Sequence, residues 1–87
     1  MITVYSKNNC PHCVQGKKML EEAGVEYEEV KIDLNPLARD FVVGEGHKSV
    51  PQFYFGDTLF VEAGYAGLKK LGHGGILRRL KELRNER

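Results

Sequence analysis

Apolar and polar residues alternate along the chain with two different periods, and these periods predict its secondary structure. Alternating β-branched or aromatic positions predict strands, and apolar positions three or four residues apart predict helices. Glycine and proline residues between these runs mark turns and helix ends. The predicted strands cover residues 2–6, 27–33, 52–55 and 58–62; the predicted helices cover 11–23, 37–43, 64–71 and 76–83, with a break over 72–75.

The order of these elements predicts the fold class. A strand–helix–strand start implies a parallel pair of strands with a right-handed crossover, and the later hairpin adds antiparallel strands. We therefore expect an α/β fold with a four-stranded mixed sheet and helices on both faces, forming one domain over residues 1–87. Tyr5, Phe53 and Phe55 are expected in the core, with Tyr54 on the opposite face of the sheet from them.

Composition excludes several classes of protein. Hydrophobic residues make up 41% of the chain and charged residues 29%, which is typical of a globular protein. No apolar stretch approaches the roughly 20 residues that a bilayer helix needs, so a membrane span is not expected. The net charge of +1 gives no general reason to expect nucleic-acid binding.

The charges are unevenly distributed. Residues 1–68 hold 6 bases and 10 acids, whereas residues 69–87 hold 7 bases and 2 acids. This basic tail could meet an acidic partner, but a solvated helix face is the simpler interpretation. His47 and His73 lie in glycine-rich turns and are expected to be surface residues. The tail residues considered for an interaction surface are Arg78, Arg79, Lys81, Arg84 and Arg87.

Two cysteines, Cys10 and Cys13, are too few for a secreted domain held together by disulfides. Residues 1–5 show no basic and apolar leader, so we expect a reducing, cytoplasmic location. A disulfide closing a four-residue loop would stabilise the fold by only ~1.9 kcal/mol, against ~3 kcal/mol for a fifteen-residue loop. The spacing therefore favours redox chemistry over a structural bridge.

The segment Cys10-Pro11-His12-Cys13 predicts which role each cysteine takes in this redox chemistry. Cys10 lies near a predicted helix N-cap, where backbone N–H groups and the macrodipole stabilise an anion, so its thiolate is the expected attacking group. Cys13, one turn further and about 5–6 Å away between Cα atoms, would then resolve the mixed disulfide. Pro11 shapes the turn. A protonated His12 would stabilise the thiolate further, unless it is only an exposed loop residue.

Five segments around the cysteine pair have a familiar spacing, namely residues 4–7, 10–13, 49–53, 63–65 and 68–83. Together they resemble the dithiol glutaredoxins of the thioredoxin-like superfamily. The resemblance implies a monomeric thiol–disulfide oxidoreductase that reduces protein or glutathione mixed disulfides, with glutathione as co-substrate and no permanently bound cofactor or metal. It also implies a cis peptide bond before Pro51. The residues carried over as glutathione-binding are Lys7, Val50, Pro51, Gly64, Tyr65 and Ala66.

Two departures from the family pattern bear on glutathione. His12 replaces the usual tyrosine. Ala66 and Gly67 stand where many glutaredoxins have a polar residue followed by aspartate, which removes an N-cap side chain and a carboxylate for the γ-glutamyl amine, each worth ~1 kcal/mol. We therefore expect weaker glutathione affinity than is usual in the family.

Other functions stay open at this point. An NrdH-type redoxin would be reduced by thioredoxin reductase instead of glutathione, and either kind of protein could supply electrons to ribonucleotide reductase. A metal-binding module could use Cys10 and Cys13 with His12 nearby, but a closed zinc site needs four ligands and no second pair is evident. An iron–sulfur cluster shared across a dimer is disfavoured by the rigid Pro11.

Overall fold

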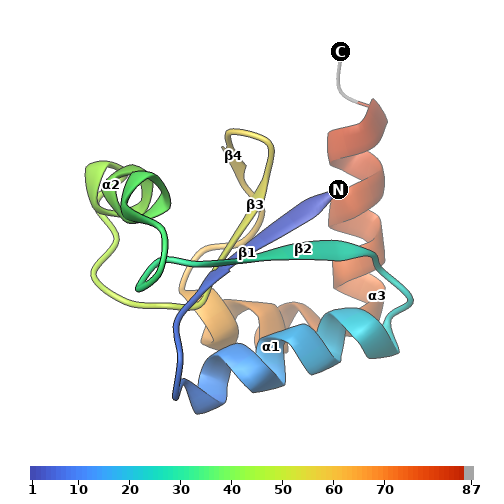
Figure 1. Cartoon of the computed structure of the whole chain (residues 1–87). Coiled ribbons are helices and arrows are strands. Elements are labelled where there is room, and N and C mark those ends of the chain that lie inside the picture. The colour runs from blue at the N-terminus through green and yellow to red at the C-terminus, as the bar shows by residue number, and fades with distance from the viewer. Residues whose placement is uncertain (86–87) are drawn as a thin grey trace.

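The computed structural model describes residues 1–85 and contains a four-stranded sheet with helices on both faces (Figure 1). In chain order the elements are β1 (Ile2–Ser6), α1 (Pro11–Glu22), β2 (Tyr27–Lys31), α2 (Pro36–Gly44), β3 (Gln52–Phe55), β4 (Thr58–Leu59) and α3 (Gly64–Asn85). None of the helices in the described range is long and apolar enough to cross a membrane.

The sheet has the strand order β2-β1-β3-β4. β1 pairs in parallel with β2 and antiparallel with β3, and β4 adds an antiparallel edge. Val4 lies opposite Phe53 in one ladder and opposite Glu29 in the other. This mixed sheet confirms the predicted α/β fold of the glutaredoxin type.

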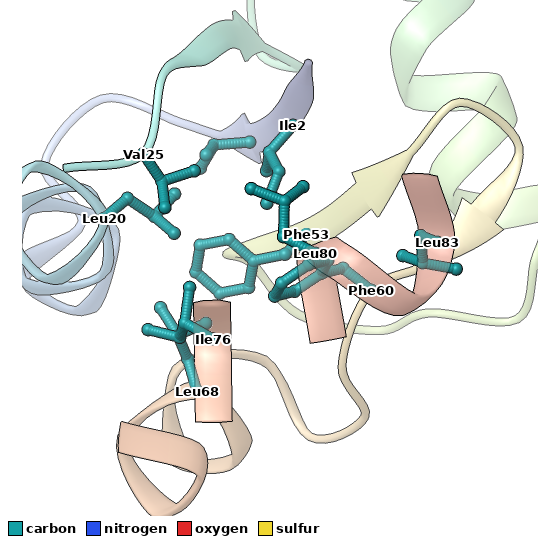
Figure 2. Packing of buried hydrophobic residues seen from close by; sticks show 10 residues of the cluster. Ile2, Leu20, Val25, Phe53, Phe60, Leu68, Ile76, Leu80 and Leu83 are labelled. Atoms are coloured by element: carbon teal, nitrogen blue, oxygen red, sulfur yellow. The ribbon is translucent and has the colours of Figure 1, made fainter. Parts of the chain in front are cut away.

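The main core lies between the sheet and the layer formed by α1 and α3 (Figure 2). Alternate positions of β1 point into it, because successive side chains of a strand face opposite sides. Gly16 allows α1 to lie close to the sheet, since a Cβ atom there would come within 2.6 Å of Cζ of Phe53. The buried residues of this core are Ile2, Val4, Leu20, Val25, Phe53, Phe60, Leu68, Ile76, Leu80 and Leu83.

The face of the sheet under α2 holds an aromatic cluster, and here one core prediction was wrong. Tyr5 packs with Tyr54, not with Phe53, because Val4 is paired with Phe53 and the residues after each of them point the other way. The ring centroids of Tyr5 and Tyr54 are 5.7 Å apart, and that of Phe41 lies 5.4 Å from the first and 5.1 Å from the second. Tyr54, 1% exposed, therefore has partners on this face.

Several element boundaries differ from the prediction, among them that of β2, which ends at Lys31 rather than at residue 33. β4 ends at Leu59 rather than continuing to residue 62, because Phe60 turns into the core and donates its N–H to the carbonyl of Phe53 at 2.8 Å. The break in α3 is confined to Gly72, whose φ of 73° and ψ of 172° interrupt the helix. Residues 73–75 were expected in the break but are helical.

Three predicted positions also differ in their surroundings. Val14 and Leu77, expected on apolar stripes, are 56% and 49% exposed. Arg79 does not lie on a freely solvated face, because its guanidinium donates to the carbonyls of Phe60 at 3.1 Å and Leu59 at 3.2 Å. This arginine joins the second half of α3 to the end of β4.

Candidate active site

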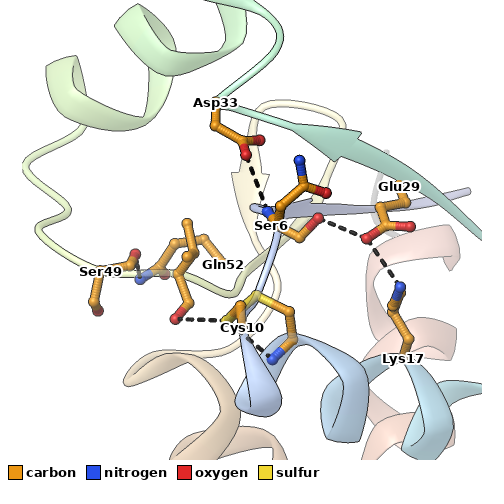
Figure 3. Close-up of a disulfide and its surroundings, with 10 residues drawn as sticks. Ser6, Cys10, Lys17, Glu29, Asp33, Ser49 and Gln52 are labelled. Carbon is orange, nitrogen blue, oxygen red and sulfur yellow. Dashed lines mark hydrogen bonds and ion pairs between the residues drawn. A yellow bond between two sulfur atoms is a disulfide. The ribbon is translucent and has the colours of Figure 1, made fainter.

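The two cysteines lie at the junction between β1 and α1. The connecting loop is held by the backbone N–H of Asn8, which donates to Asp33 Oδ2 at 3.1 Å (Figure 3). It is also held by Lys31 Nζ, which donates to Asn8 Oδ1 at 2.9 Å. Cys10 then takes an extended conformation (φ −121°, ψ 98°) as the N-cap of α1, and proline follows as the first helical residue. The sequence thus places the Cys10 sulfur at the N-terminus of α1, as predicted.

Cys10 and Cys13 form a disulfide, with their Cα atoms 5.2 Å apart (Figure 3). The Cys10 sulfur also accepts a hydrogen bond from the Cys13 N–H at 3.2 Å, so it takes the place of a capping oxygen. Cys13 is 2% exposed, whereas Cys10 is half-buried. An incoming thiol or disulfide therefore reaches Cys10 more readily, and such a pair can exchange two electrons with it.

The chain before β3 brings a backbone carbonyl to the disulfide. The Val50–Pro51 peptide bond is cis, as the resemblance implied. The carbonyl oxygen of Val50 lies 3.9 Å from the Cys10 sulfur. The backbone of Val50 is therefore within reach of a molecule bound at Cys10.

His47, at the start of that segment, was expected on the surface, and this prediction was wrong. Its Nε2 lies 2.6 Å from the Tyr54 hydroxyl in a shared hydrogen bond, with Glu45 Oε1 3.5 Å from the same hydroxyl. Burial, together with the negative charge of Glu45, raises the pKa of Tyr54, so this hydroxyl stays protonated at neutral pH. By contrast, His73 is exposed as expected and pairs with Glu22 at 3.5 Å.

Most of the residues that the resemblance assigned to glutathione lie together. A groove of about 340 Å³, here called the α3 groove, opens beside this segment. Lys7 does not line it but lies at a second groove, of about 530 Å³, which is lined by Cys10 and Cys13 among others. The α3 groove is lined by His12, Ser49, Val50, Pro51, Ala63, Gly64, Tyr65, Ala66 and Lys69.

Close backbone packing shapes the α3 groove. Gly64 has a φ of +56°, and a Cβ atom there would lie 2.6 Å from the Pro51 carbonyl oxygen, so only glycine suits this position. At Gly67 a Cβ atom would come to 1.7 Å from the carbonyl oxygen of Glu62. The first turn of α3 therefore lies against the chain before it.

Two features of this groove were missed from the sequence. The imidazole of His12 stacks on the ring of Tyr65, with centroids 5.3 Å apart and an interplanar angle of 28°. Lys69 lines the same groove from the next turn of α3. Its spacing of four residues from Tyr65 is the signal that could have placed it on the same helix face.

A polar cluster beneath the cysteine pair was also missed. Ser6 Oγ donates to Glu29 Oε2 at 2.6 Å, and Lys17 Nζ lies 3.0 Å from the same oxygen (Figure 3). The hydrogen bond from Ser6, followed by the interaction with Lys17, lowers the pKa of Glu29, although partial burial opposes the shift. A polar Ser6 at an inward-facing position of β1, between Val4 and the cysteines, was the available signal.

Within residues 1–85, no group of three His, Cys, Asp or Glu side chains is arranged to hold a metal ion.

The fold and the cysteine pair define a thiol oxidoreductase of the thioredoxin-like class. The family model described as Glutaredoxin matches residues 2–60, and this chain belongs to the glutaredoxin family. It is 33% identical over 78 residues to a glutaredoxin of Neisseria meningitidis, covering 87% of this chain and 89% of that protein. It is 39% identical over 56 residues to the glutaredoxin-like protein NrdH of Salmonella typhimurium, covering 64% and 69%.

Solved structures agree on the fold. The NrdH-redoxin of Escherichia coli is 30% identical with a TM-score of 0.61, over 64% of this chain and 74% of that one. Glutaredoxin C1 of Populus tremula x tremuloides has a TM-score of 0.76 over 98% and 79%, at 22% identity.

Proposed function

We propose that this protein is a glutathione-dependent oxidoreductase that reduces mixed disulfides of proteins or of glutathione through Cys10 and Cys13. The observation that carries this proposal is the α3 groove, which opens beside the Val50 carbonyl at the Cys10 sulfur. A tripeptide thiol whose sulfur reaches Cys10 could extend along this groove. In this proposal, thiol–disulfide exchange through Cys10 and Cys13 needs no bound cofactor.

The reaction starts with the reduced pair. The Cys10 thiolate attacks one sulfur of the substrate disulfide, that disulfide breaks, and the other half leaves as a thiolate that takes a proton. Cys13 then gives up its proton and attacks the Cys10 sulfur, releasing the bound half as a second thiol. Two electrons have passed to the substrate, and the Cys10–Cys13 disulfide has formed.

Glutathione restores the dithiol in two steps. One glutathione thiolate attacks Cys10 and frees Cys13, and a second attacks the sulfur of the bound glutathione and leaves with it as glutathione disulfide. In this proposal the Val50 backbone pairs with the cysteine moiety of glutathione, and Lys7 meets a carboxylate. The backbone of Gly64, Tyr65 and Ala66 would hold the γ-glutamyl end at the N-terminus of α3.

A second candidate is reduction by thioredoxin reductase. It is favoured by the likeness to NrdH proteins, since the E. coli NrdH-redoxin is described as having a thioredoxin-like activity profile. It is also favoured by Gly67, which supplies no carboxylate to the groove. With either donor, ribonucleotide reductase is a proposed electron acceptor. Because the dithiol must be kept reduced, we propose a cytoplasmic location.

The two candidates are separated by NADPH consumption. The oxidised protein is supplied with a disulfide substrate and either glutathione plus glutathione reductase, or thioredoxin reductase alone. The proposal expects turnover in the glutathione-coupled assay. Turnover with thioredoxin reductase only would overturn glutathione dependence while leaving the dithiol mechanism in place.

A further inference from the structure

The α3 groove carries positive charge but offers no acidic partner. Lys69 lines it from α3, close to the wall formed by the stacked rings of His12 and Tyr65. Among the described residues that line the groove, none is Asp or Glu. No ion pair found within residues 1–85 engages Lys69. Its ammonium group is therefore available to a ligand.

The backbone prevents an acidic side chain from being added at Gly67, the residue that follows the lining residue Ala66. A Cβ atom at Gly67 would lie 1.7 Å from the Glu62 carbonyl oxygen and 3.2 Å from Cγ2 of Val61. A side chain there requires the chain over 61–62 to move, so the missing carboxylate is a consequence of how the loop packs. A ligand ammonium in this groove would meet Lys69 and find no counter-charge among the lining residues.

The γ-glutamyl end of glutathione carries a carboxylate and an ammonium on the same carbon. The groove suits the first group and opposes the second. We propose that the α3 groove selects disulfides whose bound half carries a carboxylate without a neighbouring ammonium, as in a protein segment with Asp or Glu close to its cysteine. This inference rests on the proposed function, because it concerns the same groove and the same attack by Cys10.

The test uses two small disulfides that differ only in that ammonium. Glutathione and glutaryl-cysteinyl-glycine, which lacks the α-amino group, are each converted to the 2-pyridyl disulfide. Attack by Cys10 of the reduced protein on the peptide sulfur releases 2-thiopyridone, whose absorbance gives the second-order rate constant. Exposed ion pairs correspond to changes of up to about fivefold, so we expect the glutaryl compound to react about twofold to fivefold faster.

Two variants of equal net charge separate a local effect from a general one. Lys69→Glu places an acid in the groove, and we expect it to reverse the preference so that the glutathione compound reacts faster. Lys70→Glu changes a neighbouring exposed residue that does not line the groove, and the wild-type preference is expected to remain. Equal rates for the two compounds in the wild type, or the same ratio in both variants, would overturn the inference.

Failure of the proposed function gives a different result. If neither compound reacts faster with the wild type than with Cys10→Ser, the dithiol mechanism itself is wrong. If both react but oxidised protein is not recycled by glutathione, only the choice of electron donor is wrong.

Discussion

At the scale of single residues, the two cysteines have unequal surroundings. Cys10 caps α1 and accepts the Cys13 N–H, while Cys13 lies buried one turn inside. Lowering a thiol pKa from ~8.5 to ~5 raises its thiolate fraction at pH 7 about 30-fold, but its nucleophilicity falls by a similar factor. We therefore expect the cap to favour Cys10 mainly as a leaving group, which would make the protein disulfide easier to reduce.

Glu29 gives a prediction about acid stability. Its pKa is lowered from 4.5 by Ser6 and then Lys17, so its contribution to stability is present above that unfolded-state value and is lost as pH falls through the lower folded value. Glu29→Gln should lower the free energy of unfolding by about 1 kcal/mol at pH 7 and flatten its decline below pH 4.5. Urea unfolding between pH 7 and 3 measures both effects.

Glu28→Gln is the matched control, since Glu28 lies on the same strand and is exposed. We expect it to keep the acid-dependent decline of the wild type. The same decline in the Glu29 variant would contradict a role for the Ser6–Glu29–Lys17 cluster in stability.

At the scale of elements, the approach of α1 to the sheet depends on Gly16. Gly16→Ala would place Cβ 2.6 Å from the ring of Phe53, which is fully buried. Overpacking of this kind costs about 1–3 kcal/mol. Gly44→Ala, with no atom within 4 Å of the new Cβ, serves as control and should change stability little. Thermal unfolding measures the stability of both variants. Equal midpoints would show that the packing of α1 against Phe53 does not require glycine at position 16.

The attachment of α3 to the hairpin gives a second prediction at this scale. Arg79→Ala removes two hydrogen bonds to carbonyl groups at the end of β4, so we expect it to lower the free energy of unfolding by about 1–2 kcal/mol. Arg78→Ala, at an exposed neighbouring position, should stay within about 0.5 kcal/mol of the wild type. Denaturant unfolding measures the free energy of unfolding of both variants. An equal decrease in the two would contradict a specific role for Arg79.

At the scale of the whole molecule, local sequence patterns predicted the secondary-structure elements, whereas contacts between distant segments could not be predicted from them. The elements, the parallel first pair of strands in a mixed sheet and the N-cap position of Cys10 follow from periodicity, proline and the strand–helix–strand crossover. The pairing of β1 with β3 determines which face each aromatic residue occupies, and no local pattern shows that register. Tyr5 was therefore placed on the wrong face, and His47 was taken for a surface residue because its partner Tyr54 lies in another element.

The candidate active site was also predictable only in part from the sequence. Spacing placed both cysteines, and the resemblance located Val50, Pro51 and Gly64 at one groove. The spacing of Lys69 from Tyr65 and the inward-facing Ser6 were signals in the sequence, but the groove beside Lys69 and the partners of Ser6 could not be assigned, since each depends on how a helix packs against a distant segment.

Single-turnover thiol release from reduced single-cysteine variants tests most directly which sulfur reacts. Mixed with a pyridyl disulfide, Cys13→Ser should release one equivalent of thiopyridone and retain the other half covalently on Cys10. Cys10→Ser should release it at least tenfold more slowly, because its remaining sulfur is buried. Equal rates from the two variants would contradict the claim that the sulfur at the tip of α1 begins the reaction.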